Sequence, residues 1–163
     1  MGIAAFFTSI PQATLQSLLE DPEKVVELLY PDDDGDPPNS FDVDKAWHGL
    51  HYLLTGEAEG GPAPLSLAIL EGAEIGPELD FGPARYLTPE EVGAVAQALA
   101  ALTPASLAER YNSRDMREKQ IYPEIWDDDD PESVDYLLHF FPDLQRFYAD
   151  AAARGDAVIH WMA

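Results

Sequence analysis

Two histidines, His48 and His51, stand three residues apart in the segment 42–56, which also contains Asp44 and Trp47. If this segment is a helix, Asp44, His48 and His51 fall within ~60° of one another, because successive residues turn by about 100°. Neutral imidazoles and a carboxylate suit zinc or a similar ion. Histidine also titrates near neutral pH, as acid–base catalysis requires. The segment therefore predicts a ligand-binding flank, bordered by Trp47, with His48 and His51 as candidate metal ligands.

The same helix has a purely structural interpretation. Its opposite sector is apolar and consists of Val43, Ala46, Trp47, Leu50, Leu53 and Leu54. His48 and His51 would then hydrogen-bond a neighbouring loop, while Asp44 would hold Lys45 or a ring N–H. The HExxH pattern of zinc enzymes is absent, and a third metal ligand would have to come from His139, His160 or an acidic loop. We therefore expect neither a metal nor a cofactor.

Arg85 and Tyr86 form a second candidate pair. Arg85 is isolated from other basic residues and follows Gly82-Pro83, where the backbone is expected to turn sharply. Its planar guanidinium could clamp a carboxylate or phosphate of a ligand. Alternatively, it forms an internal salt bridge, for which this acidic chain offers many partners.

Tyr122 and Trp126 precede an acidic run at 127–130. Aromatic rings rimmed by carboxylates can hold a cation or a basic peptide, although such residues also anchor loops onto a core. The run itself suits a solvated helix N-terminus, where negative charge is favourable. Residues 32–36 look like part of a calcium loop, but Pro37 replaces the required glycine and Val43 the bidentate glutamate.

Periodicity and capping signals predict the elements that must position these residues. Helices are expected over 11–20, capped by Ser9 and Gln12, over 22–30, 42–56 and 88–102, after Thr103-Pro104, and from Pro131 onward. Pro142 either kinks this last helix or starts its successor. Strands are expected at 2–8, 65–70, 81–87 and 156–162. These elements predict an α/β (α+β) fold, with a small mixed β-sheet that contains both chain ends and is covered by helices.

Segments along nearly the whole chain resemble one family. They include DKAWHGLHYLLTG at 44–56, PLSLAIL at 64–70, GPARYLTPEEV at 82–92, IYPEIW at 121–126 and RGDAVIHW at 154–161. On these residues the chain resembles the YfbM-like proteins, which are bacterial and have a domain of unknown function. The resemblance implies a single domain over residues 1–163, a three-layer α/β architecture and a cytoplasmic location. It brings no assigned activity and no catalytic residues.

The charge balance restricts the kinds of partner. Nine basic residues face 31 acidic ones, which gives a net charge of −22. Such a chain repels the phosphates of nucleic acids and of anionic membranes, and no apolar stretch approaches the ~20 residues of a membrane helix. The sequence has no cysteine, which excludes disulfides and thiolate chemistry and fits a reducing compartment.

Two functions remain. The first is a non-enzymatic acidic module that binds a basic protein, for example an inhibitor or immunity-type protein that covers a basic nuclease site. The alternative is a small-ligand-binding protein or enzyme whose pocket is formed by the 44–51 helix and the Arg85 segment. Walker, GxGxxG and GxSxG motifs are absent from the sequence, which disfavours the usual nucleotide and serine-hydrolase scaffolds. The alternative requires that its two segments converge in space.

Overall fold

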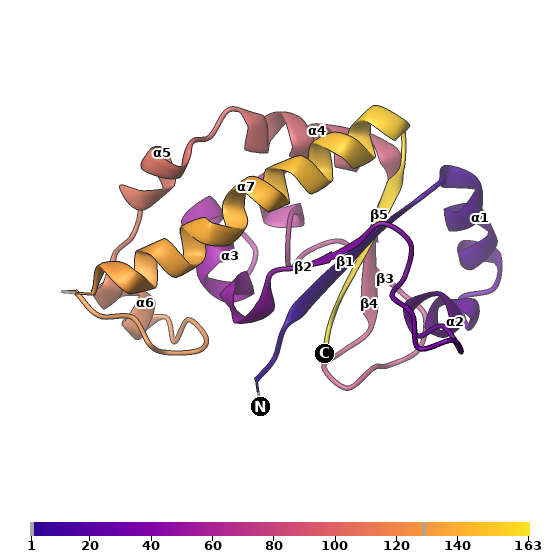
Figure 1. The fold of residues 1–163 in the computed structure, drawn as a ribbon, viewed down its shortest axis with the longest axis horizontal. Helices are drawn as coiled ribbons and strands as arrows, with labels where there is room; N and C mark the ends of the chain where they lie inside the picture. Colours follow the sequence, from indigo (N-terminus) through magenta and orange to yellow (C-terminus); the bar gives the residue numbers. More distant parts are fainter. Residues whose placement is uncertain (1, 129) are drawn as a thin grey trace.

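The computed structural model describes residues 2–128 and 130–163 and contains a five-stranded sheet. The strand order is β2 (Ser40–Asp42), β1 (Ala5–Ile10), β5 (Ala157–Met162), β4 (Ala84–Leu87) and β3 (Ala73–Ile75). Each neighbouring pair is antiparallel. The first and last strands therefore lie side by side at the centre, and both chain ends emerge at the same edge of the molecule (Figure 1).

The sheet is apolar on both faces, because side chains along a strand point alternately to opposite sides. Phe7 and Val158 belong to one hydrophobic cluster, whereas Ile10 and Ile159 belong to the other. A sheet with two apolar faces must be covered on both. This gives three layers.

Helices fill the two outer layers unequally (Figure 1). The larger layer contains α3 (Trp47–Thr55), α4 (Pro89–Ala100), α5 (Pro104–Ala108), α6 (Ser113–Glu118) and α7 (Pro131–Arg154), together with the 3₁₀ turns η1 (Asp44–Ala46) and η2 (Leu65–Leu67). The smaller layer contains α1 (Gln12–Glu20) and α2 (Lys24–Leu29). Among the residues that the structure describes, no helix is both long and apolar enough to cross a membrane.

The predicted α/β class and the sheet that contains both chain ends are confirmed. The pairing of its five strands is antiparallel throughout rather than mixed. The helix predicted over 88–102 is confirmed as α4, with the Thr88 hydroxyl accepting the N–H of Glu91 and the Glu91 carboxylate accepting the N–H of Thr88. The terminal strand expected at 156–162 is β5.

Three local predictions are wrong. The helix expected over 42–56 begins later, because Asp42 ends β2 and η1 (Asp44–Ala46) precedes α3. Residues 65–70 form η2 and a turn rather than a strand; Ala68 and Ile69 are buried in the larger layer, and the Ala68 carbonyl accepts a hydrogen bond from Tyr148. A short apolar run fits a buried helical turn as well as a buried strand. The expected Ser9 cap is also absent, because Ser9 belongs to β1 and its hydroxyl accepts a hydrogen bond from Arg154.

Pro142 lies inside a single helix of 24 residues, so it does not start a successor. The edge strands β2 and β3 are each three residues long and were not predicted. Segments this short give no readable alternation.

Candidate functional site

Trp47, His48 and Arg85 line a common cavity of about 410 Å³, which we call the polar cavity. It lies where α3 and residues 59–71 approach β4 and β5. His160, Phe81 and Trp161 complete much of its wall. The 44–51 helix and the Arg85 segment therefore do meet in space, on the larger-layer side of the sheet.

His48 uses both of its ring nitrogens in internal hydrogen bonds. Nε2 lies 2.9 Å from the carbonyl oxygen of Ala58, and Nδ1 lies 2.8 Å from the backbone nitrogen of Tyr122. A carbonyl only accepts and a backbone N–H only donates, so Nε2 carries the proton and Nδ1 accepts. Burial lowers the pKa of His48, which keeps this neutral form at physiological pH. Neither nitrogen has a lone pair left for a metal or a substrate.

His51 holds the same loop as His48. It is fully buried, and its Nε2 lies 2.9 Å from the carbonyl oxygen of Gly60. Glu71 accepts the N–H of Gly60 from the other side. Burial lowers the pKa of His51. Its Nδ1 is buried and makes no hydrogen bond within the described part of the chain. The two histidines thus clamp the loop after α3, as the structural interpretation of the sequence predicted.

Arg85 is also engaged internally. Its Nη1 donates to the carbonyl of Gly72 at 2.8 Å, and its Nη2 lies 3.5 Å from the carboxylate of Glu74. His160 is the cross-strand neighbour of Arg85, and its Nε2 donates to the carbonyl of Glu71 at 2.7 Å. Burial, aided by the Arg85 charge, lowers the pKa of His160 to about 4. The polar cavity therefore presents neutral imidazoles and an arginine that already has partners.

The remaining predicted residues lie outside the lining of the polar cavity. Asp44 precedes α3 in η1, and its carboxylate accepts a hydrogen bond from the Tyr136 hydroxyl at 2.9 Å. Asp44 therefore does not share one helix face with His48 and His51, contrary to the prediction from the sequence. Tyr86 packs against the smaller layer, on the other face of the sheet. Tyr122 stacks on Trp47, with ring centroids 5.3 Å apart, and its hydroxyl accepts the N–H of Ile3.

Trp126 is buried and donates from Nε1 to the carbonyl of Ile121 at 2.8 Å. Tyr122 and Trp126 thus anchor their segment onto the core. Asp130 caps α7 by accepting the N–H of Glu132, as expected for the end of the acidic run, whereas Asp129 lies outside the described residues. Within residues 2–128 and 130–163, no three His, Asp or Glu side chains gather in a group that could hold a metal ion.

A second cavity, of about 440 Å³, opens on the opposite face of the sheet. We call it the aromatic cavity. Its floor is the cross-strand pair Phe6 and Trp161, whose rings stack with centroids 5.6 Å apart. Tyr30 also lines it and is half exposed, whereas the ring of Phe41, another lining residue, packs on Phe7 and Phe147 on the larger-layer face. Trp161 is buried, so Phe6 and Tyr30 supply most of the aromatic surface that a ligand can reach.

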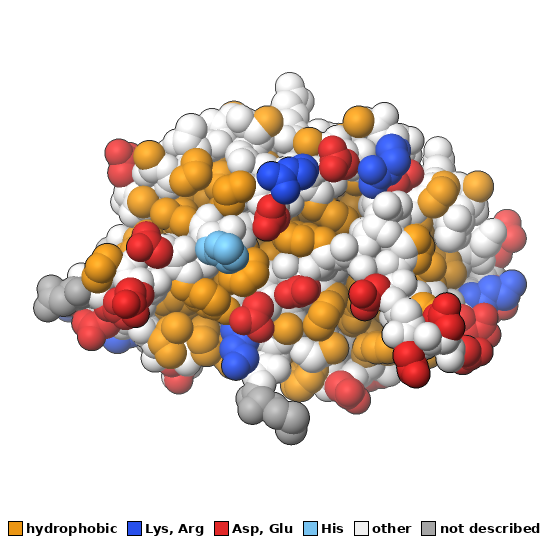
Figure 2. Space-filling model, in the orientation of Figure 1, with side chains coloured by type: hydrophobic (Ala, Val, Ile, Leu, Met, Phe, Trp, Pro, Cys, Tyr) orange, Lys and Arg blue, Asp and Glu red, His pale blue; other side chains and the backbone are white. Residues whose placement is uncertain are grey.

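The rim of the aromatic cavity is acidic. Asp34 and Asp36 come from the loop after α2, and Asp42 comes from β2; all three are exposed. No lysine or arginine is among the described residues that line this cavity. Acidic side chains gather over the same part of the molecule, around α2 and the loop that leads to β2 (Figure 2). A cation placed over the rings would meet carboxylates on more than one side.

Sequence reasoning indicated the acidic loop at 32–36 but missed the aromatic floor. Phe6 and Trp161 lie at opposite ends of the chain and meet only through the pairing of β1 with β5. The one available signal was the alternation in both terminal segments, which places each aromatic on a definite face once the register is known.

Comparison with known proteins gives a family and a fold. The model of a family described as "Domain of unknown function (DUF1877)" matches residues 1–161. Protein YfbM of Escherichia coli (strain K12) is 29% identical over 129 residues, which cover 77% of this chain and 75% of that protein. The crystal structure of YfbM, titled as a protein of unknown function, superposes with a TM-score of 0.72 at 21% identity, covering 98% of this chain and 99% of that one.

Proposed function

The chain belongs to the DUF1877 family, and because that family is described only as a domain of unknown function, we propose from its own surface that it is a non-enzymatic module that binds a basic protein. The aromatic cavity is the anchor of this interaction. It receives at least one cationic side chain of the partner, an arginine or a lysine.

The observation that carries the proposal is the stacked pair Phe6 and Trp161 under the carboxylates of Asp34, Asp36 and Asp42. A guanidinium or ammonium over an aromatic face gains about 0.5–2 kcal/mol, and more when it is desolvated. Carboxylates at the rim accept charge-assisted hydrogen bonds, which a guanidinium can donate in bidentate geometry. Rings and carboxylates together favour a cationic side chain over an apolar or an acidic one.

The net charge of −22 supports the same class of partner. A strongly negative protein accelerates its encounter with a positive one and repels other acidic proteins. An inhibitor that covers the basic active site of a nuclease is one concrete form of this function. The charge is spread over the surface, and the cavity supplies the local specificity that charge alone lacks.

A small-ligand site in the polar cavity is the second candidate function, favoured by the convergence of Trp47, His48 and Arg85. It ranks second because both ring nitrogens of His48 already form hydrogen bonds within the protein. The Arg85 guanidinium likewise donates to the Gly72 carbonyl and pairs with the Glu74 carboxylate. A ligand would have to displace contacts that hold the loop after α3.

The test is an NMR titration that follows the backbone amide shifts of the ¹⁵N-labelled protein in ¹H–¹⁵N correlation spectra. The ligand is N-acetyl-arginine-N-methylamide, which presents a single arginine side chain. The control ligand is the citrulline analogue, which has nearly the same shape but no charge. We expect millimolar binding of the arginine compound, with shifts confined to the amides around Asp34, Asp36 and Ser40. Shifts clustered around Glu59 and Glu71 would favour the polar cavity. Equal binding of the citrulline compound would overturn the proposal.

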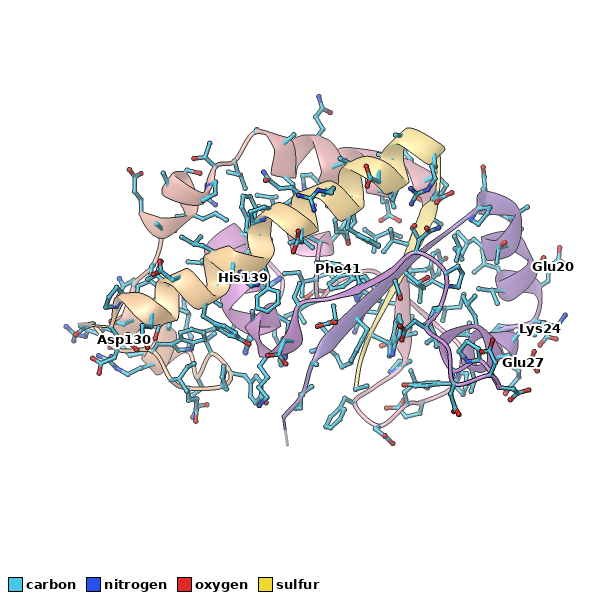
Figure 3. The ribbon with its side chains drawn as sticks, in the orientation of Figure 1. Glu20, Lys24, Glu27, Phe41, Asp130 and His139 are labelled. Carbon is cyan, nitrogen blue, oxygen red and sulfur yellow. The ribbon has the colours of Figure 1, made fainter. Side chains whose placement is uncertain are left out.

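Two matched variants distinguish the effect of the rim carboxylates on affinity from the effect of the overall net charge. Asp34→Asn, Asp36→Asn and Asp42→Asn together remove three rim charges while keeping the side-chain shapes. Glu20→Gln, Glu90→Gln and Glu109→Gln together remove the same charge from exposed sites elsewhere; Figure 3 shows Glu20 on α1, away from the edge strand β2. We expect the rim variant to lose at least tenfold in affinity and the control variant less than threefold. Similar losses in both would show that no specific site exists.

A further inference from the structure

The edge strand β2 has one side free. It is the outermost strand of the sheet and pairs only with β1 (Figure 1). The N–H of Val43 donates to the carbonyl of Ala5, and the register places Phe41 opposite Phe7. Because hydrogen-bonded and non-hydrogen-bonded pairs alternate in antiparallel strands, Phe41 bonds inward to β1. The N–H and C=O groups of Ser40 and Asp42 therefore point outward, away from the sheet.

Hollows flank β2 on both faces of the sheet. The aromatic cavity lies on one face, and on the other lies a hollow of about 300 Å³ between β2 and α7, which we call the α7 hollow. Ser40 and Phe41 line both. Figure 3 shows Phe41 beneath α7, where its ring stacks on Phe147 with centroids 5.4 Å apart. A strand added beside β2 would direct successive side chains alternately toward the aromatic cavity and the α7 hollow.

The two hollows differ in charge. The aromatic cavity carries the unbalanced carboxylates of Asp34, Asp36 and Asp42. The α7 hollow is lined by two arginines, Arg146 and Arg154, and by two aspartates, Asp143 and Asp150. Arg146 pairs with Asp143 at 3.0 Å, and Arg154 also pairs with Asp156, outside the lining, at 2.9 Å. The α7 hollow is therefore nearly neutral around an aromatic floor. An added strand would suit this edge best with basic residues on one face and apolar residues on the other.

We propose that β2 binds an extended segment of the basic partner as an additional antiparallel strand, with basic side chains at every second position entering the aromatic cavity. This inference rests on the proposed function and specifies how the partner is held. The acidic rim excludes a second copy of this chain as the occupant, because its own β2 edge carries the same charges and charged edges resist self-pairing.

The pairing geometry identifies the backbone groups of the partner that matter. Residues opposite Ser40 and Asp42 exchange hydrogen bonds with them and place their side chains on the same face, that of the aromatic cavity. In an alternating arginine–valine peptide, the arginines take these positions. Methylating the arginine amides removes the donors to β2, whereas methylating the valine amides changes only N–H groups that point away from it.

The experiment compares four acetylated, amidated heptapeptides by isothermal titration and by hydrogen exchange of the protein. They are the alternating arginine–valine parent, its form with methylated arginine amides, its form with methylated valine amides, and a citrulline–valine peptide. We expect arginine-amide methylation to weaken binding at least tenfold and valine-amide methylation less than twofold. The parent should also slow exchange of the Ser40 and Asp42 amides.

Each other outcome is decisive. If both methylated peptides bind like the parent, or both lose equally, strand addition is wrong, while the proposed cation site stands. If the citrulline–valine peptide binds as tightly as the parent, the proposed function fails and this inference fails with it. Unchanged exchange at Ser40 and Asp42 with tight binding of the parent would place the peptide elsewhere.

Discussion

Nδ1 of His48 accepts the backbone N–H of Tyr122 at 2.8 Å, and this contact ties α3 to the segment that precedes α7. The opposite nitrogen of the same ring donates to the carbonyl of Ala58. One imidazole therefore joins three segments of the chain. This dual use explains why a histidine, with one donor and one acceptor on opposite sides of a flat ring, suits this position.

Replacement of His48 should destabilise the fold. His48→Ala leaves the Tyr122 N–H and the Ala58 carbonyl without partners in a partly buried place, and each such loss costs about 1–3 kcal/mol. We expect the free energy of unfolding to fall by about 2–4 kcal/mol, measured by urea denaturation.

The control is His139→Ala, which removes an exposed histidine from α7 (Figure 3). An exposed substitution should change the free energy of unfolding by no more than about 0.5 kcal/mol. If His48→Ala were equally silent, His48 would not be a structural residue, and the functional interpretation of the 42–56 segment would gain support.

Acid should weaken the fold through His160. Its pKa is about 4 in the folded chain, against 6.5 for the free side chain, because burial disfavours the imidazolium. Between these values the unfolded chain binds a proton that the folded chain does not, so the stability contribution is complete above pH 6.5 and declines as the pH falls toward 4. The full difference corresponds to about 3 kcal/mol.

Two measurements check this prediction. The ring protons of His160, followed by NMR, should show no titration between pH 7 and 5. The free energy of unfolding of the wild type should fall more steeply between pH 6.5 and 4.5 than that of His160→Gln, which keeps an N–H donor for the Glu71 carbonyl but cannot take up a proton. Parallel slopes for the two proteins would assign the acid sensitivity to other groups.

How well each element could be predicted depended on the sequence separation of the residues whose contacts determine it. The start of α4 was predictable because the Thr88–Glu91 capping box joins residues three apart. The segment 65–70 was not, because its apolar run has no period and its conformation is set by packing under Tyr148, far along the chain. Structure set by contacts between residues close in the sequence could be predicted, whereas structure set by tertiary packing could not.

The candidate site follows the same rule. The sequence singled out His48 and His51 by type and spacing, yet only their burial and the Ala58 and Gly60 carbonyls decide between ligand site and loop clamp. The aromatic floor needs the register of β1 against β5, which pairs Phe6 with Trp161. No local pattern contains that information.

The α4 capping box should contribute measurably to stability. Thr88→Ala removes the hydroxyl that accepts the Glu91 N–H and should lower the free energy of unfolding by about 1 kcal/mol. Thr88→Ser keeps the oxygen and should stay within about 0.5 kcal/mol of the wild type. Thermal unfolding of the three proteins side by side tests the difference, and an equal effect of both substitutions would assign the role of Thr88 to its methyl group instead.

Two helical glycines should respond in opposite directions to alanine. A β-carbon at Gly49, in α3, would lie 2.6 Å from Cδ2 of Leu137 on α7 and 3.0 Å from the Trp126 ring. Overpacking of this kind costs about 1–3 kcal/mol, and it outweighs the helix-propensity gain of up to about 1 kcal/mol. At Gly93, in α4, a β-carbon meets no atom within 4 Å, so Gly93→Ala should gain about 0.5–1 kcal/mol. Because the chemical change is identical, urea denaturation of the pair isolates the packing of α3 against α7. Stabilisation by both substitutions would mean that this interface is looser than the structure has it.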